Sequence, residues 1–84
     1  MSDKKTVVEH QPANLRFIVP RNEGVAELSY QLPDESRVHF VRTYVPPELR
    51  KQQLAEKLVR TGLAWAKECN KTVTTECWYV EKFL

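Results

Sequence analysis

The most regular hydrophobic pattern in the chain lies between Gln53 and Cys69. Leu54, Leu58 and Trp65 recur with a period of about 3.6 residues, which is typical of an amphipathic helix. The same stripe holds Ala55, Val59, Leu63 and Ala66, whereas the polar face holds Lys57, Arg60, Lys67 and Glu68. We therefore predict one long helix that packs its apolar side against a sheet.

Two residues of this segment are expected to have special backbone roles. Asn70 follows the last periodic residue and can adopt the left-handed conformation that ends many helices. Gly62 lies inside the helix, where glycine costs roughly 0.5–1 kcal/mol relative to alanine. We expect a close approach to a strand or a ligand at this glycine.

Three segments before the helix alternate between apolar and polar residues, as half-buried strands do. They span residues 14–20, with Leu15, Phe17 and Val19 on one face, residues 25–32, with Ala26, Leu28, Tyr30 and Leu32 on one face, and residues 37–45, rich in β-branched and aromatic residues. Turn-forming residues separate them at 21–24 and 33–36. Short turns join antiparallel neighbours, so we predict an antiparallel meander.

The chain after these strands predicts a parallel crossover. Pro46 and Pro47 end the third strand, because proline cannot donate a ladder hydrogen bond. Residues 71–77 are again β-like and should lie parallel to the third strand, since a helix connects the two. Residues 78–84 fit a short closing helix. The predicted fold class is α+β, with the element order β-β-β-α-β-α.

The predicted domain organisation is simple. Residues 1–13 show no periodicity and form a flexible segment or, around Thr6–Val8, a short edge strand, whereas residues 14–84 form a single domain. A chain of 84 residues has a thin core. Dimerisation would stabilise such a chain, so a homodimer is a further prediction.

Composition narrows the partners. Thirteen basic and eleven acidic residues give a net charge of +2, which is too balanced to predict a nucleic-acid interface. No segment reaches the ~20 apolar residues of a membrane helix, and no signal peptide is visible, so we expect a soluble cytoplasmic protein. In that compartment Cys69 and Cys77 are expected to be reduced thiols.

The start of the long helix is a candidate anion site. A helix N-terminus presents unpaired N–H groups, and Arg50 and Lys51 stand beside this one. The glycines that usually let a backbone wrap a phosphate are absent. A solvated turn with two surface cations is therefore an open alternative.

Four short motifs match a known family. They are Thr-Tyr-Val-Pro-Pro-Glu-Leu-Arg at 43–50, Leu-Ala-Glu-Lys-Leu-Val-Arg at 54–60, Cys-Trp-Tyr-Val at 77–80 and Lys-Phe-Leu at 82–84. From Leu15 onwards the chain resembles the minimal single-domain members of the GCN5-related N-acetyltransferase superfamily. The resemblance implies the same element order, acetyl-CoA as cosubstrate and an amine as acetyl acceptor.

The resemblance also implies a cofactor site. In the superfamily the helix begins with Arg or Gln, two variable residues, Gly, one variable residue and Gly or Ala, and this loop holds the pyrophosphate. Arg50 and Ala55 match, whereas Gln53 replaces the central glycine and Lys51 a second one. The backbone of the third strand would pair with the pantetheine arm as an added strand does. The implied cofactor-binding residues are Thr43, Tyr44, Val45, Arg50, Lys51, Gln52, Gln53, Leu54 and Ala55.

Cys77 and Tyr79 are the candidate catalytic residues implied by the resemblance. Cys77 matches a cysteine of the small members and would lie near the thioester as an acceptor or a lining group. Tyr79 stands where the superfamily often has an acid for the departing thiolate, although an aromatic residue there also suits the core. His39, Glu27 and Glu76 are weaker candidates for proton transfer, with surface positions as the alternative. Arg42 replaces a histidine that the small members often carry, so no role transfers there.

Other chemistry finds no support in the sequence. The two histidines and two cysteines lack zinc spacing, and no metal is expected. Trp65 and Trp78 are predicted to be core residues.

Three interpretations of the function stay open at this point. The first is an acetyl-CoA-dependent N-acetyltransferase with an unidentified amine acceptor. The second is a module of the same fold that has lost catalysis, with or without loss of the cofactor, through Lys51 and Gln53. The third is a dimeric interaction protein. Fold resemblance alone does not choose among them.

Overall fold

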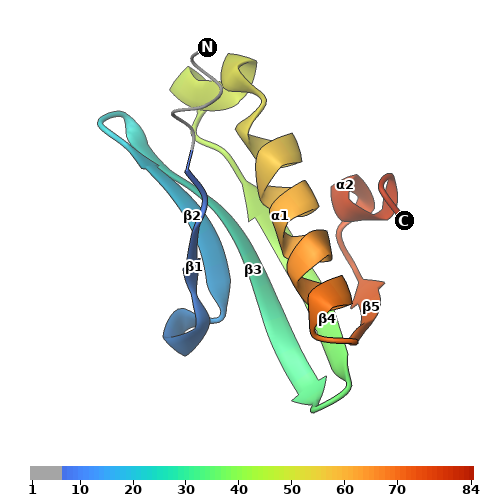
Figure 1. Ribbon diagram of the computed structural model, residues 1–84. Coiled ribbons are helices and arrows are strands. Elements are labelled where there is room, and N and C mark those ends of the chain that lie inside the picture. Colours follow the sequence, from blue (N-terminus) through green and yellow to red (C-terminus); the bar gives the residue numbers. More distant parts are fainter. Residues whose placement is uncertain (1–6) are drawn as a thin grey trace.

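A long helix lies across one face of a five-stranded sheet (Figure 1). The computed structural model describes residues 7–84. The strands are β1 (Glu9–Gln11), β2 (Arg16–Arg21), β3 (Gly24–Asp34), β4 (Arg37–Tyr44) and β5 (Thr72–Thr75). The helices are the 3-10 turns η2 (Pro12–Asn14) and η3 (Pro47–Gln52) and the α-helices α1 (Leu54–Glu68) and α2 (Trp78–Glu81).

The sheet has the predicted topology. Its strands are ordered β1-β2-β3-β4-β5. The pairs from β1 to β4 are antiparallel, and β5 is parallel to β4, from which it is separated by α1. The α+β class, the antiparallel meander and the parallel crossover are therefore confirmed.

One strand lies outside the predicted order. β1 pairs with β2 from Glu9 opposite Ile18 to Gln11 opposite Arg16. The edge strand expected around residues 6–8 is displaced, since Val7 and Val8 precede β1 and Thr6 lies outside the described residues. The Glu-His-Gln sequence of β1 carries no apolar alternation that would have revealed it.

Two residues assigned to the buried faces were predicted wrongly. Leu15 is not in a strand but caps η2 with a left-handed φ of 55°, and its side chain is 37% exposed. Leu32 is 43% exposed. The register steps from Gln31 opposite His39 to Asp34 opposite Arg37, so β3 contains one extra residue there. Such a bulge changes the face on which the following side chains lie.

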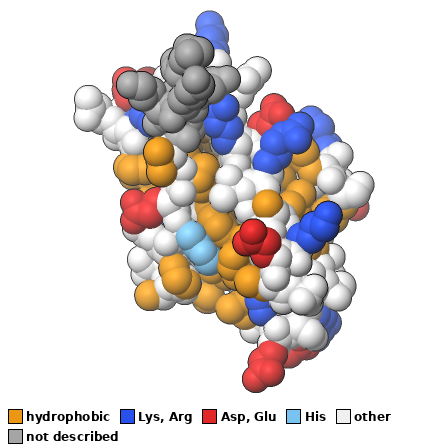
Figure 2. Space-filling view, viewed as in Figure 1, with side chains coloured by type: hydrophobic (Ala, Val, Ile, Leu, Met, Phe, Trp, Pro, Cys, Tyr) orange, Lys and Arg blue, Asp and Glu red, His pale blue; other side chains and the backbone are white. Residues whose placement is uncertain are grey.

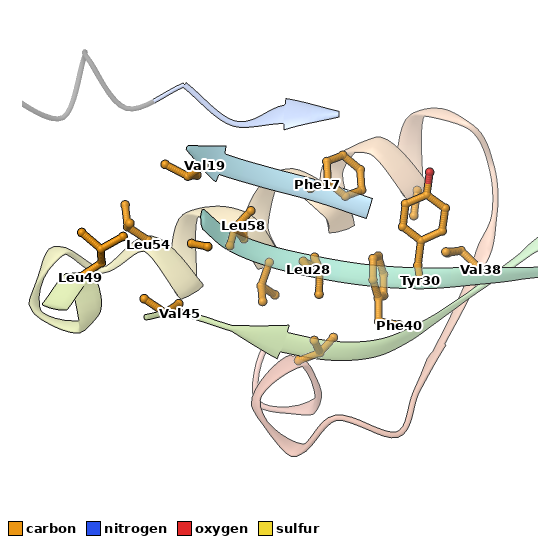
Figure 3. Packing of buried hydrophobic residues seen from close by; sticks show 14 residues of the cluster. Phe17, Val19, Leu28, Tyr30, Val38, Phe40, Val45, Leu49, Leu54 and Leu58 are labelled. Atoms are coloured by element: carbon orange, nitrogen blue, oxygen red, sulfur yellow. The ribbon is translucent and has the colours of Figure 1, made fainter. Parts of the chain in front are cut away.

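The core lies between α1 and the sheet (Figure 3). Its largest fully buried side chains are Phe17, Val19, Leu28, Val38, Phe40, Leu49, Leu54, Leu58, Val59 and Val80. Gly62 faces this core, because a Cβ atom there would lie 2.9 Å from Leu28 Cδ2 and 3.1 Å from Phe40 Cε1. The predicted close approach of the helix to a strand is confirmed.

The ends of α1 fall within one residue of the prediction. Gln53, with φ 59°, precedes the helix, and Asn70, with φ 57°, follows it in the expected left-handed conformation. The Lys71 N–H donates to the Ala66 carbonyl at 2.9 Å and so closes the last turn.

The two tryptophans differ in burial. Trp65 packs against the core and contacts the rings of His10, Phe17 and Tyr30. Trp78, in contrast, is 70% exposed, so its assignment to the core was wrong. The sequence showed an aromatic residue after a strand, which does not reveal that α2 turns this ring outwards.

The visible surface carries charges of both signs. Figure 2 shows acidic and basic side chains interspersed on the face that α1 covers. Within residues 7–84, none of the helices is long and apolar enough to span a membrane.

Candidate functional site

β4 and β5 separate halfway along β4, and this separation creates the candidate site. The strands pair from Arg37 opposite Thr72 to Phe40 opposite Thr75. The Glu76 N–H makes one more bond to the Phe40 carbonyl at 3.2 Å. The Thr75 hydroxyl donates to the same carbonyl at 2.9 Å and accepts from the Cys77 N–H at 2.9 Å, so it fixes the point of divergence.

A bulge in β4 accompanies the separation. Tyr30 lies opposite Phe40, but Ser29 lies opposite Arg42, so Val41 is an extra residue. A bulge bends its strand and increases the local twist. It also moves the inward face of β4 from even to odd positions, because Thr43 lies opposite the buried Leu28. The sequence alternation did not reveal this bulge.

A pocket of about 500 Å³ fills the space between the separated strands. Its walls are Thr43, Tyr44, Val45, Arg50, Gln53, Ala55, Glu56, Cys77, Trp78 and Tyr79. The end of β4, the start of α1 and the start of α2 each contribute to it. Two stretches distant in sequence, residues 43–56 and 77–79, thus meet around one cavity.

The start of α1 provides backbone donors. The first intrahelical bond runs from the Lys57 N–H to the Gln53 carbonyl, so the N–H groups of residues 54–56 have no acceptor within the helix. No side chain among residues 7–84 caps this end. Gln53 has the left-handed φ that a glycine adopts readily, so the loop keeps a glycine-like shape with a glutamine in it.

Arg50 is held in place by the strand that it faces. Its Nε donates to the Val45 carbonyl at 3.0 Å. This bond ties η3 to the end of β4 and uses one of the five guanidinium donors. The carbonyl of Val45, which was expected to face the pantetheine arm, already accepts this bond.

Most of the expected site residues lie in the pocket wall. Eight of the eleven do so: Thr43, Tyr44, Val45, Arg50, Gln53, Ala55, Cys77 and Tyr79. Lys51 and Gln52 are exposed residues of η3 outside the wall. The side chain of Leu54 is buried in the core, so only its backbone N–H can face a ligand.

Cys77 is a partly buried thiol at the base of the pocket. Its Sγ lies 3.6 Å from the Thr43 Oγ1. Burial opposes ionisation, but interactions with the backbone at Val80, the Thr43 hydroxyl and the backbone at Tyr79 and Thr43 together outweigh it. The net effect lowers the pKa of Cys77 below its usual value of 9.0. A thiol of lowered pKa is a better nucleophile at neutral pH.

Tyr79 has the opposite tendency. Its burial, and then the negative charge of Glu56, raise the pKa of the phenol above 10.0, while Arg60 partly counteracts this. The phenol therefore stays protonated at neutral pH and can donate a proton or hydrogen bond. Glu56 is itself paired with Arg60 at 2.8 Å.

Two wall residues were not among the expected ones. Glu56 lies in the first turn of α1, and its helical position three residues after Gln53 could have suggested it. Trp78 could not have been found from periodicity, which favoured burial.

The weaker candidates lie outside the wall. His39 contacts Thr74 at 2.8 Å and Glu76 at 3.1 Å, and Glu27 pairs with Arg16 at 3.3 Å. Within residues 7–84, no three His, Cys, Asp or Glu side chains cluster to hold a metal ion.

A helix covers a mostly antiparallel sheet, and its two parallel strands separate beside a pocket, which is the α+β arrangement expected from the sequence. Comparisons with known proteins agree. A family model described as GCN5-related N-acetyl-transferase matches residues 16–84, and the chain belongs to this family.

A solved structure supports the fold. A GCN5-like protein of Staphylococcus aureus, determined by NMR in solution, superposes with a TM-score of 0.71 at 21% identity. The match covers 93% of this chain and 76% of the other. No curated protein matches the chain.

Proposed function

We propose that this protein is an acetyl-CoA-dependent N-acetyltransferase that transfers acetyl to an amine. The observation that carries the proposal is one pocket in which a helix N-terminus, an unpaired strand edge, a thiol of lowered pKa and a protonated phenol meet. The family supports acetyl-CoA as cosubstrate.

The residues present fit this cosubstrate. The free N–H groups of residues 54–56 and the remaining guanidinium donors of Arg50 suit a pyrophosphate. Gln53 keeps the loop in a glycine-like conformation, with its side chain exposed at the pocket wall. Among residues 7–84, β4 has no strand partner on its β5 side beyond Phe40, so its backbone can pair with an amide-bearing arm.

Tyr79 and Cys77 are the proposed reactive groups. The bound thioester supplies an activated acetyl carbonyl. As the acceptor nitrogen bonds to this carbon and the carbon–sulfur bond breaks, Tyr79 donates its proton to the departing sulfur. The nitrogen loses its proton to solvent. In a two-step route, the Cys77 thiolate bonds to the acetyl carbon as the coenzyme's carbon–sulfur bond breaks, and the amine then displaces the Cys77 sulfur.

Calorimetric titration with acetyl-CoA tests the binding half of the proposal. The parent protein should bind, and ligand at 100 times its dissociation constant should stabilise the fold by about 2.7 kcal/mol. Arg50→Ala should weaken binding and reduce its dependence on salt, because it removes a charge from the pyrophosphate site. Lys67→Ala, an exposed position of α1 away from the pocket, is the matched control. Absence of any binding by the parent would refute the proposal.

Turnover tests the catalytic half. The parent, Tyr79→Phe and Cys77→Ala are compared for acetylation of an amine panel. Loss of the acid should lower kcat by roughly 100-fold. Intact mass after incubation with acetyl-CoA alone shows whether Cys77 takes the acetyl group. Unchanged kcat in Cys77→Ala together with no acetylated thiol would limit Cys77 to lining the pocket.

A further inference from the structure

Two exposed aromatic rings of the pocket wall each carry a cation over the ring. Tyr44 is 38% exposed and Trp78 is 70% exposed. The guanidinium carbon of Arg42 lies 5.2 Å from the Tyr44 ring centre, and the Lys82 Nζ lies 5.3 Å from that of Trp78. We call these four residues the aromatic-basic rim.

Tyr44 and Trp78 line the same pocket as the start of α1, but part of the rim lies on the other face of the sheet. Tyr44 lies opposite Glu27 in β3, whereas the next residue pair, Thr43 opposite Leu28, faces the core. Tyr44 and Arg42 therefore lie on the sheet face that α1 does not cover. Trp78 directly follows Cys77, so the rim adjoins the proposed reactive thiol.

The rim cations are not neutralised by the described part of the chain. Arg16, Arg37 and Arg60 each form an ion pair with a carboxylate. Within residues 7–84, the side chains of Arg42 and Lys82 make only their cation–π contacts. The one carboxylate of the pocket wall, Glu56, is occupied by Arg60. The rim thus places two positive charges beside two exposed aromatic rings.

Such a surface selects among amines. It disfavours a polyamine or a lysine-rich peptide as acceptor, because Arg42 and Lys82 would repel the further positive charges. A ring can stack on the exposed faces of Tyr44 or Trp78, and a carboxylate can bind the cations at the same time.

We propose that the acetyl acceptor is a small amine that bears both an aromatic ring and a carboxylate. This inference rests on the proposed function and deepens it, because it names the acceptor class. The rim binds the ring and the carboxylate, so that the amino group reaches the acetyl carbon beside Cys77.

Matched amines test the proposal. Phenylalanine and tryptophan are compared with phenethylamine and tryptamine, which lack the carboxylate, and with alanine, which lacks the ring. The two aromatic carboxylates should have a kcat/KM at least roughly tenfold above their counterparts. Equal or faster turnover of the decarboxylated amines, or of spermidine, would overturn the proposal.

Substitutions in the rim test whether its residues cause the preference for aromatic amines that bear a carboxylate. Arg42→Gln and Lys82→Gln should lower kcat/KM for the aromatic carboxylates roughly tenfold and leave the decarboxylated amines unchanged. Trp78→Phe should retain more activity than Trp78→Ala, since a ring still stacks. Lys67→Gln removes an equal charge away from the pocket and should change nothing.

The acetyl-CoA affinity of the parent and the variants distinguishes a failure of this inference from a failure of the proposed function. If Arg42→Gln or Lys82→Gln weakens acetyl-CoA binding as much as turnover, these cations bind the cosubstrate and the acceptor assignment is wrong. If the parent binds acetyl-CoA and acetylates only polycations, the proposed function stands and this inference fails. If the parent binds no acetyl-CoA, the proposed function itself fails.

Discussion

The two halves of the sheet are built for different purposes. Under α1, β2 and β3 pair over six consecutive positions, and side chains such as Val19 and Leu28 are fully buried. At the other edge, β4 and β5 pair over four positions and then separate. Every residue of the pocket wall comes from that edge or from the helix starts beside it. Continuous pairing stabilises the first half, and interrupted pairing in the second leaves backbone that, in the proposed function, pairs with the cosubstrate.

β4 takes part in both halves. Up to Phe40 its residues bury side chains and pair on both edges. After Val41 the same strand pairs, within the described part of the chain, only with β3, and its other edge lies beside the pocket. The division between stability and binding therefore runs through one strand, and substitutions on either side of it should have different effects.

The largest expected contrast is between Leu58→Ala and Trp78→Ala. Leu58 is fully buried, so its truncation should destabilise the fold by roughly 2–5 kcal/mol. Trp78 is a larger side chain but mostly exposed, and its loss should change stability by less than about 0.5 kcal/mol. Urea unfolding of both variants measures this. A comparable loss in the two would mean that the divergent edge is part of the core.

Gly62→Ala should have the next largest effect. The new Cβ would lie 2.9 Å from Leu28 Cδ2 and 3.1 Å from Phe40 Cε1, and overpacking of this kind costs roughly 1–3 kcal/mol. The higher helix propensity of alanine offsets up to about 1 kcal/mol. We expect a lower melting temperature than in Lys67→Ala on the exposed face of α1. A gain in stability would show that the helix can move away from the sheet.

A smaller effect concerns how the stability of the half of the sheet under α1 depends on pH. Burial lowers the pKa of His10 below 6.5; its Nε2 lies 2.6 Å from the Tyr30 hydroxyl and its ring stacks on Phe17. The unfolded chain then binds more protons below pH 6.5, so the free energy of unfolding should fall as the pH drops through that value. His10→Gln should lose this part of the dependence, as urea unfolding above and below pH 6.5 will show. An identical pH profile in the variant would exclude His10 as its source.

The smallest change in stability is expected for Gln53→Gly. Glycine removes roughly 1 kcal/mol of left-handed backbone strain from the folded state. It also raises the conformational entropy of the unfolded chain, which costs a similar free energy. Acetyl-CoA affinity should rise if the glutamine side chain obstructs the ligand. Asn70→Gly, with φ 57° at the other end of α1, is the matched control for the backbone effect. Calorimetry should show tighter binding only in Gln53→Gly, and unchanged affinity would remove the obstruction argument.

Sequence periodicity was sufficient for the elements that bury one face. α1, β3 as far as Tyr30 and β4 as far as Phe40 combine regular spacing with side chains that only a core can accommodate. The failures have physical causes. β1 is a polar strand of three residues, Leu15 caps a 3-10 turn, and both bulges add a residue that shifts the alternation without any marker in the pattern.

The sequence could single out residues of the candidate site but not their arrangement in space. Resemblance to the family singled out Arg50, Cys77 and Tyr79, and all three lie in the pocket wall. It could not show that Arg50 binds the Val45 carbonyl or that Trp78 is exposed, since both depend on how η3 and α2 meet the strands. Glu56 could have been suggested by its helical position three residues after Gln53.

The extra residue Val41 accompanies the point at which β4 separates from β5. From Glu27 opposite Tyr44 to Gln31 opposite His39 the register between β3 and β4 is regular apart from this residue, so a chain without it could pair without a break over that stretch. Deletion of one codon would then leave the buried residues in place while β4 ran straight alongside β5. A single inserted residue would then separate a sheet that opens beside a pocket from a sheet that does not.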